Sequence, residues 1–114
     1  MFEVNYCMDA GGHQPAKEFI DTLNPKMKAK VFGRIELLET NGSLLGMPFA
    51  RHVEDGIWEL RTPQGNDITR VLYFFTQGKK AWLTNGFVKK TQKTPPAEIK
   101  RAKRIRQDWR DRHE

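Results

Sequence analysis

The expected fold is decided by two segments, Ile68-Thr-Arg-Val-Leu-Tyr-Phe-Phe-Thr76 and Lys80-Ala-Trp-Leu-Thr-Asn-Gly-Phe-Val-Lys89. Both are rich in β-branched and aromatic residues, a composition that favours strands. Gln77-Gly78 separates them and suits a short turn between antiparallel strands. A two-residue turn here places Arg70 opposite Asn85. The sequence therefore predicts an antiparallel hairpin.

A third strand, predicted over 52–62, precedes the turn-like residues Pro63-Gln-Gly-Asn66. Two registers remain open across this turn: one puts Glu59 opposite Arg70, and the other puts Arg61 opposite Arg70. The proline suits the second position of the longer turn, which favours Glu59 opposite Arg70. Both registers leave these charged side chains on the same face of the sheet, because cross-strand partners project to one side.

The alternation of strand side chains divides the three strands into two faces. The first face is expected to carry the charged residues together with aliphatic ones: Glu59, Arg61, Ile68, Arg70, Leu72, Leu83, Asn85, Phe87 and Lys89. The second face is expected to form an apolar floor for helices: Trp58, Leu60, Val71, Tyr73, Phe75 and Trp82.

The remaining segments predict one further strand and three helices. The alternating residues 2–6 indicate the strand, and residues 14–23 indicate a short helix. A second helix is expected to begin at Asn24-Pro25, an N-cap followed by proline, and to end at Asn41-Gly42. The last helix follows the prolines after Thr94 and ends near Arg112. The expected architecture is one α+β domain over 1–114: a strand, a helical hairpin, a three-stranded antiparallel meander and a C-terminal helix.

Positive charge is concentrated in the second half of the chain. The formal charge is +6 and the isoelectric point is about 9.7, with −2 over residues 1–57 and +8 over residues 58–114. Such an asymmetry indicates an anionic partner such as a nucleic acid, although a solvated basic helix is an alternative. Binding to a membrane surface is disfavoured, because the basic region lacks a wide apolar helix face.

Composition excludes several other classes of protein. The aromatic content of 11% is too high for a disordered chain. Cys7 is the sole cysteine, which excludes a disulfide framework, and it is expected to be a small core residue. No apolar run is long enough to span a membrane, and no secretory signal precedes the first strand, so a cytoplasmic location is expected. The three histidines lie far apart, and neither a metal site nor a cofactor is predicted.

Arg70 is the most informative charged residue, because a guanidinium in a central strand is costly unless it is paired. Three interpretations remain open. Arg70 forms a cross-strand ion pair with Glu59, or it contacts phosphate within a cluster that includes Arg61 and Lys89, or the pair serves both purposes. Lys90 and Lys93 lie just beyond the end of the strand and extend such a cluster.

Three motifs resemble one known family. They are Asp55-Gly-Ile-Trp-Glu-Leu-Arg61, Thr69-Arg-Val-Leu-Tyr-Phe74, and Asn85-Gly-Phe-Val-Lys-Lys-Thr-Gln-Lys-Thr-Pro95 followed by Glu98-Ile99 and Ala102. They resemble the phage Gp49-like, HigB-type branch of the RelE/ParE toxin superfamily. The resemblance extends over residues 49–106, and the order of the predicted elements is also that of the family.

This resemblance implies a RelE-like fold and the toxin of a type II toxin–antitoxin pair. Such toxins are typically ribosome-dependent mRNA endoribonucleases that use no metal or other cofactor. The implied partners are a helix-turn-helix (HigA-like) antitoxin, the ribosome and mRNA. Trp109 is expected either to pack on the sheet or to contact this antitoxin.

The resemblance also assigns site residues by position: Arg61, Arg70, Lys89 and Lys90 match the basic residues that the family places on its concave sheet face. In the implied reaction the RNA 2′-OH attacks the adjacent phosphate and leaves a 2′,3′-cyclic phosphate. Arginine suits the charge of the transition state, so Arg61 and Arg70 are expected at the scissile phosphate.

The remaining assignments concern RNA contacts and proton transfer. Lys89, Lys90 and Lys93 are expected at the scissile phosphate or its neighbours. Glu59 is a candidate general base if it is not locked to Arg70, and His52, further along its strand, is a weaker candidate. Some relatives use a tyrosine or histidine near the C-terminus, where this chain offers His113. Further RNA contacts are expected from His52, Lys79 and Lys80.

Two other functions stay open at this point. A ParE-like toxin would inhibit DNA gyrase by protein contact and would need no charge cluster on the sheet. A plain basic nucleic-acid-binding module would bind without cleavage, with an affinity that falls as salt rises.

Overall fold

The computed structural model describes residues 1–89 and 93–113. Its strands are β1 (Glu3–Tyr6), β2 (Ala50–Glu54), β3 (Ile57–Gln64), β4 (Asp67–Thr76) and β5 (Lys80–Lys89), and its helices are α1 (Pro15–Asp21), α2 (Pro25–Asn41), the short 3-10 helix η1 (Gly42–Leu44) and α3 (Pro96–His113). The strands form one mixed sheet in the order β1-β5-β4-β3-β2. β1 is parallel to β5, and the other neighbours are antiparallel.

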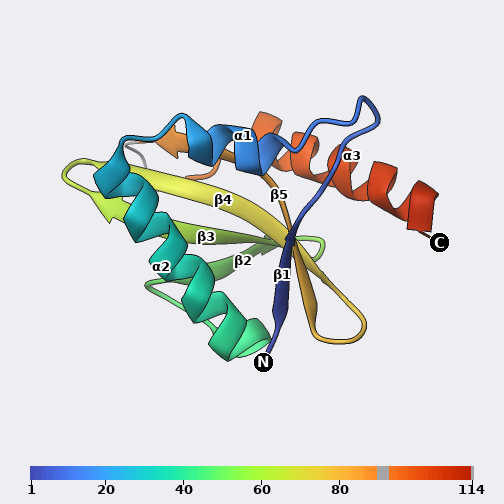
Figure 1. Ribbon diagram of the computed structural model, residues 1–114, viewed down its shortest axis with the longest axis horizontal. Coiled ribbons are helices and arrows are strands. Elements are labelled where there is room, and N and C mark those ends of the chain that lie inside the picture. Colours follow the sequence, from blue (N-terminus) through green and yellow to red (C-terminus); the bar gives the residue numbers. More distant parts are fainter. Residues whose placement is uncertain (90–92, 114) are drawn as a thin grey trace.

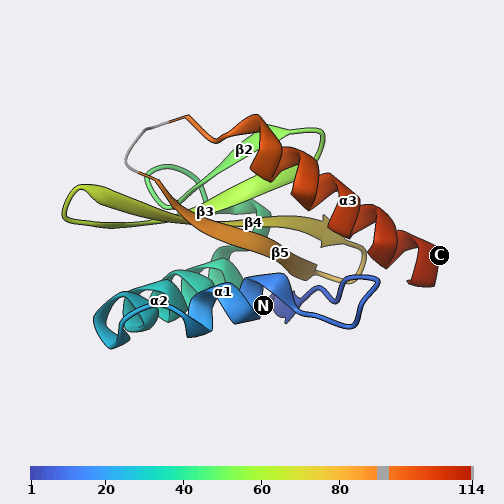
Figure 2. The same cartoon turned by 90° about the horizontal axis from the view of Figure 1, so that it is seen from above.

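The sheet separates two apolar cores. Helices α1 and α2 cover one face and α3 covers the other (Figures 1 and 2). The core under α1 and α2 includes Leu60, Val71, Tyr73 and Leu83 from the sheet. The core under α3 includes Ile57, Leu72, Phe74 and Phe87 from the sheet, with Ile105 and Trp109 from the helix. The predicted α+β class is confirmed, and Trp109 packs on the sheet.

The ends of α2 follow the predicted capping residues. The Asn24 side chain accepts a hydrogen bond from the Met27 backbone N–H at 2.8 Å, and Pro25 opens the helix. Gly42 follows the helix with φ of +54°, a conformation that favours glycine. Local chemistry therefore sets both ends of this helix.

The single strand predicted over 52–62 is wrong, because the chain turns at Asp55-Gly56 to make β2 and β3. Both turn residues have positive φ, +49° and +75°. This is the two-residue hairpin that Asp-Gly favours. The antiparallel part of the sheet therefore has four strands in place of the predicted three.

Two glycine substitutions with opposite expected effects on the free energy of unfolding test the conformation of the Asp55-Gly56 turn. Gly56→Ala should lower the free energy of unfolding by about 1–2 kcal/mol, because Gly56 lies in the left-handed region. Gly33→Ala, at an exposed α2 position with open space around an added Cβ, should instead stabilise by roughly 0.5–1 kcal/mol. Urea unfolding measures both changes. A loss no larger for Gly56→Ala than for Gly33→Ala would contradict this description of the turn.

The turn between β3 and β4 gives the less favoured of the two predicted registers. Gln64 pairs with Asp67, so Arg61 lies opposite Arg70, and the predicted preference for Glu59 opposite Arg70 is wrong. The proline lies within β3, and Gly65 takes φ of +60°. Glycine at the first position of a two-residue turn allows this tighter connection.

The β4–β5 turn also differs from the prediction. Thr76 pairs with Lys80, and the intervening residues include Lys79 with φ of +58°. The additional turn residue reverses two side chains: Leu83 lies in the core under α1 and α2, and Trp82 lies on the α3 side. A bulge beyond this point restores the predicted side for the rest of β5, and Arg70 pairs with Phe87 in place of Asn85.

Candidate functional site

Three arginines surround one carboxylate on the α3 side of the sheet. Arg51 Nε lies 2.5 Å from Glu59 Oε2, and Arg61 Nε lies 3.9 Å from the same oxygen. Arg70 Nε lies 3.8 Å from Glu59 Oε1. We call Arg51, Glu59, Arg61 and Arg70 the Glu59 cluster. It spans β2, β3 and β4.

Strand pairing explains why these four residues meet. Arg51 is the cross-strand partner of Glu59, and Arg61 is the partner of Arg70. Glu59 and Arg61 are two residues apart on β3 and so project to the same face. The predicted shared face of Glu59, Arg61 and Arg70 is confirmed.

Three members of the Glu59 cluster are buried, whereas the side chain of Arg51 is 37% exposed, and the cluster carries an excess of positive charge. Glu59 and Arg70 are 0% exposed, and Arg61 is 8% exposed. Three guanidinium groups and one carboxylate sum to a formal charge of +2. Burial lowers the pKa of Arg70, and the Glu59 carboxylate acts in the opposite direction. Such a cluster electrostatically favours an additional anion nearby.

Thr94, just before α3, covers the carboxylate of the cluster. Its hydroxyl donates to Glu59 Oε1 at 2.5 Å, and Arg51 Nη2 donates to Thr94 Oγ1 at 3.3 Å. Thr94 is itself 3% exposed. Both carboxylate oxygens of Glu59 therefore have close partners.

These contacts correct two expectations. Arg70 is expected from the sequence at the scissile phosphate, but it has no exposed surface and therefore no access to a phosphate in this conformation. Glu59 is expected to act as a general base only if its carboxylate is not held by other side chains. Arg51 and Thr94 both hold this carboxylate. The structure therefore contains the predicted ion pair between Arg70 and Glu59, although Arg51 lies closer to Glu59 than Arg70 does.

Two exposed lysines lie next to this cluster. Lys89 follows Phe87, the partner of Arg70, by two residues on β5 and so projects to the same face. Lys93 is exposed and immediately precedes Thr94. Lys90, also predicted for the site, lies outside the described residues. Among the described residues, accessible cations of this region thus lie on β2 (Arg51), at the end of β5 (Lys89) and just before α3 (Lys93).

The structure places the other predicted residues elsewhere. His52 stacks edge-on against Trp58, which belongs to the opposite core, so His52 lies on the other face of the sheet. Lys80 begins β5 and Lys89 ends it, roughly 30 Å apart along the strand, and Lys79 is in the preceding turn. His113 stacks on Trp109 at the far end of α3.

The sequence did not single out Arg51, although it is the closest of the three arginines to Glu59. A local signal was present, because Asp55-Gly56 is a strong hairpin signal. Folding β2 back at that point places Arg51 beside Glu59.

Polar contacts from Arg106 and Glu98 hold α3 over the sheet. Arg106 Nη1 donates to the Asp55 carbonyl at 2.5 Å, and Nη2 contacts the Asp55 carboxylate at 2.8 Å. Asn85 Nδ2 donates to Glu98 Oε1 at 3.1 Å. The β2–β3 turn and β5 therefore fix the position of the helix.

Cys7 lies outside the Glu59 cluster, and its burial predicts how the stability of the fold changes with pH. It is fully buried, and burial raises the pKa of its thiol to about 12. Above about pH 9 the unfolded chain loses this proton while the folded chain keeps it, so stability falls as pH rises. The expected contribution is about 1.4 kcal/mol per pH unit. Urea unfolding of Cys7→Ala between pH 8 and 11 should show a shallower decline; an unchanged slope would contradict this assignment.

Among the residues described, no three His, Cys, Asp or Glu side chains form a cluster that could hold a metal ion. None of the helices in the described ranges has the length and apolar content needed to cross a bilayer.

The fold and the Glu59 cluster define a small basic α+β protein with buried and exposed cations on one sheet face. Within this class the chain belongs to the family described as phage-derived protein Gp49-like (DUF891), whose model matches residues 18–107. This is a RelE/HigB-type toxin family, associated with toxin–antitoxin systems and therefore with an antitoxin partner. This match begins at residue 18, whereas the resemblance seen in the sequence motifs begins at residue 49. A search of curated proteins finds no match.

Proposed function

We propose that this chain is a toxin that cleaves mRNA on the ribosome without a metal ion. The observation that supports it is the formal charge of +2 on the Glu59 cluster, next to the exposed Lys89 and Lys93. An RNA phosphate complements this excess charge. The proposed partners are the ribosome, mRNA and a HigA-like helix-turn-helix antitoxin, and the proposed location is the cytoplasm.

In the proposed reaction the RNA 2′-oxygen attacks the adjacent phosphorus. A bond from the 2′-oxygen to phosphorus forms and the bond to the 5′-oxygen breaks, leaving a 2′,3′-cyclic phosphate. The 2′-hydroxyl gives up its proton, and the departing 5′-oxygen gains one. The protein contributes by aligning the RNA and by neutralising charge on the phosphate in the transition state.

The burial of each cation suggests its part in this reaction. Lys89 and Lys93 are exposed, and they are proposed to contact phosphate oxygens together with Lys90. Arg61, which retains 8% of its surface, is proposed to lie behind them at the scissile phosphate. Arg70 and Glu59 are proposed as positioning residues, because they hold Arg61 and Arg51 from within the sheet.

The experiment is controlled expression in growing bacteria, with mapping of mRNA 5′ ends. The proposal predicts growth arrest within minutes and new ends that share one position within the codon. Repeating the mapping with purified ribosomes and message tests whether the chain itself makes the cut. Growth arrest with an unchanged set of mRNA ends contradicts the proposal.

The burial of Arg70 and Glu59 favours a second candidate function, because inhibition by protein contact needs no accessible charge cluster. In that case the chain would act as a ParE-like inhibitor of DNA gyrase. Accumulation of DNA breaks while mRNA stays intact would select this function. Salt-dependent RNA binding with neither breaks nor cleavage would select a simple nucleic-acid-binding module.

A further inference from the structure

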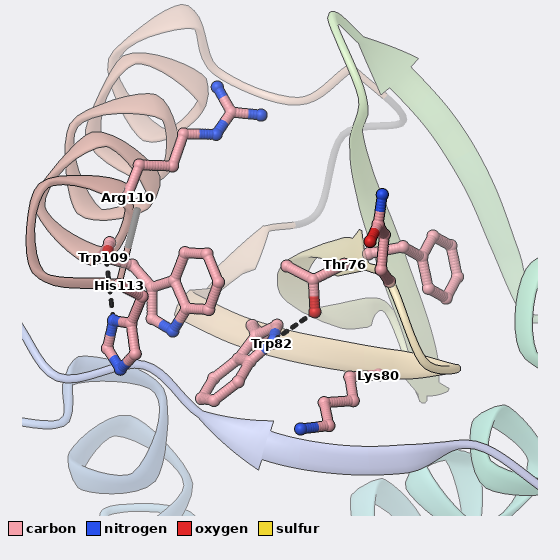
Figure 3. Close-up of a pocket in the computed structure, with 8 residues that line it drawn as sticks. Thr76, Lys80, Trp82, Trp109, Arg110 and His113 are labelled. Carbon is pink, nitrogen blue, oxygen red and sulfur yellow. Dashed lines mark hydrogen bonds between the residues drawn. The ribbon is translucent and has the colours of Figure 1, made fainter.

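A pocket lies at the other end of the sheet from Lys89, between the last turn of α3 and the β4–β5 turn (Figure 3). Its volume is about 860 Å³, within the range of pockets that bind small molecules. Its principal side chains are three rings, two exposed cations and one hydroxyl: Trp82, Trp109, His113, Lys80, Arg110 and Thr76.

The three rings adjoin one another, with Trp109 between His113 and Trp82, and the plane of Trp82 is inclined by 50° to that of Trp109. The Trp109 and His113 rings stack with centroids 4.5 Å apart and planes inclined by 10°. The Trp82 and Trp109 rings are 5.0 Å apart. Trp82 Nε1 donates to Thr76 Oγ1 at 2.9 Å, which fixes the orientation of the indole. Trp82 is only partly buried, so part of its ring is accessible from the pocket.

The cations flank this ring surface. In Figure 3, Lys80 lies on one side of Trp82, and Arg110 lies on the other side, beyond Trp109. None of the described residues that line the pocket is acidic. The pocket therefore offers the ring of Trp82, a single planar face, between two positive charges.

We propose that this pocket binds one nucleotide of a single-stranded nucleic acid. The base stacks on Trp82, and the phosphates on its two sides contact Lys80 and Arg110. Aromatic rings combined with cations are the means by which proteins bind single strands without reading their sequence. An acidic peptide would use the cations but leave the planar face without a matching group. This site is separate from the proposed cleavage site and requires no cleavage.

The test is binding of a 2′-O-methyl uridine hexanucleotide, followed by quenching of tryptophan fluorescence. Its blocked 2′-oxygen prevents cleavage. The measurement uses a Trp58→Phe background, because the chain has three tryptophans and the other two, Trp82 and Trp109, line the pocket. The oligonucleotide should quench their emission. High salt should weaken binding, with a log–log slope of about −0.7 per phosphate contacted.

The decisive comparison uses two double variants that remove the same charge. Lys80→Ala with Arg110→Ala should weaken binding at least about tenfold and reduce the salt slope by about 1.4. Lys26→Ala with Lys30→Ala removes two exposed lysines on α2 and should change the affinity by less than about twofold. Equal losses in the two variants, or no quenching by the oligonucleotide, would overturn the proposal.

Two further measurements distinguish nucleotide binding in this pocket from binding at the proposed cleavage site and from binding of an acidic peptide. Lys89→Ala with Lys93→Ala should leave the quenching intact even if cleavage is lost, so the two sites are tested independently. An oligoglutamate that quenches the tryptophans while the oligonucleotide does not would assign the pocket to an acidic peptide and refute the nucleotide assignment.

Discussion

Glu59→Gln is expected to lower the free energy of unfolding by about 3–5 kcal/mol. Glu59 is the carboxylate that all three arginines of the Glu59 cluster approach, and it is 0% exposed. Glutamine keeps its size and removes its charge, so the guanidinium groups then repel one another inside the fold. Domains of this size are commonly stable by about 5–15 kcal/mol, and the loss is a large fraction of that.

The matched control is Glu54→Gln, the same substitution at the end of β2. Glu54 also contacts a cation, with Lys103 Nζ at 2.5 Å from Oε2, but its side chain is 53% exposed. Solvent screens such a contact, and the expected loss is below about 1 kcal/mol. Urea unfolding at neutral pH compares the two variants. Equal losses would show that the carboxylate of the Glu59 cluster stabilises the fold no more than a surface contact does.

The parts of the fold that depend on neighbouring residues were predictable from the sequence. The beginning of α2 follows from Asn24 and Pro25, and its end follows from Gly42. The Asp55-Gly56 turn carried a comparable local signal, which the prediction of one strand over 52–62 did not use. Local signals of this kind indicate where a helix or turn lies, but not which other elements pack against it.

The parts that depend on distant contacts were not predictable. The side to which Trp82 points depends on one additional residue in the β4–β5 turn and on a bulge further along β5. The shared face of Glu59, Arg61 and Arg70 followed from strand alternation. The burial of Glu59 did not, because its carboxylate is covered by Thr94, 35 residues further along the chain. Accessibility of a site is a property of the packed molecule.

Lys89→Ala with Lys93→Ala is expected to slow mRNA cleavage at least about 100-fold. Both lysines are exposed, so the fold should remain intact. Their proposed contacts strengthen as charge develops on the phosphate, and the cleavage rate should therefore fall more than ribosome binding does. Lys26→Ala with Lys30→Ala removes the same charge from α2 and should retain a rate within about threefold of the parent chain.

The most direct test of the central claim is the single-turnover cleavage rate of mRNA on purified, programmed ribosomes, measured by primer extension for the parent chain and both double variants. The account predicts rapid cleavage by the parent chain and the α2 variant, and a rate at least about 100-fold lower for Lys89→Ala with Lys93→Ala at saturating protein. Equal rates for the two variants, or no cleavage by the parent chain, would contradict the claim that this face of the sheet cuts RNA.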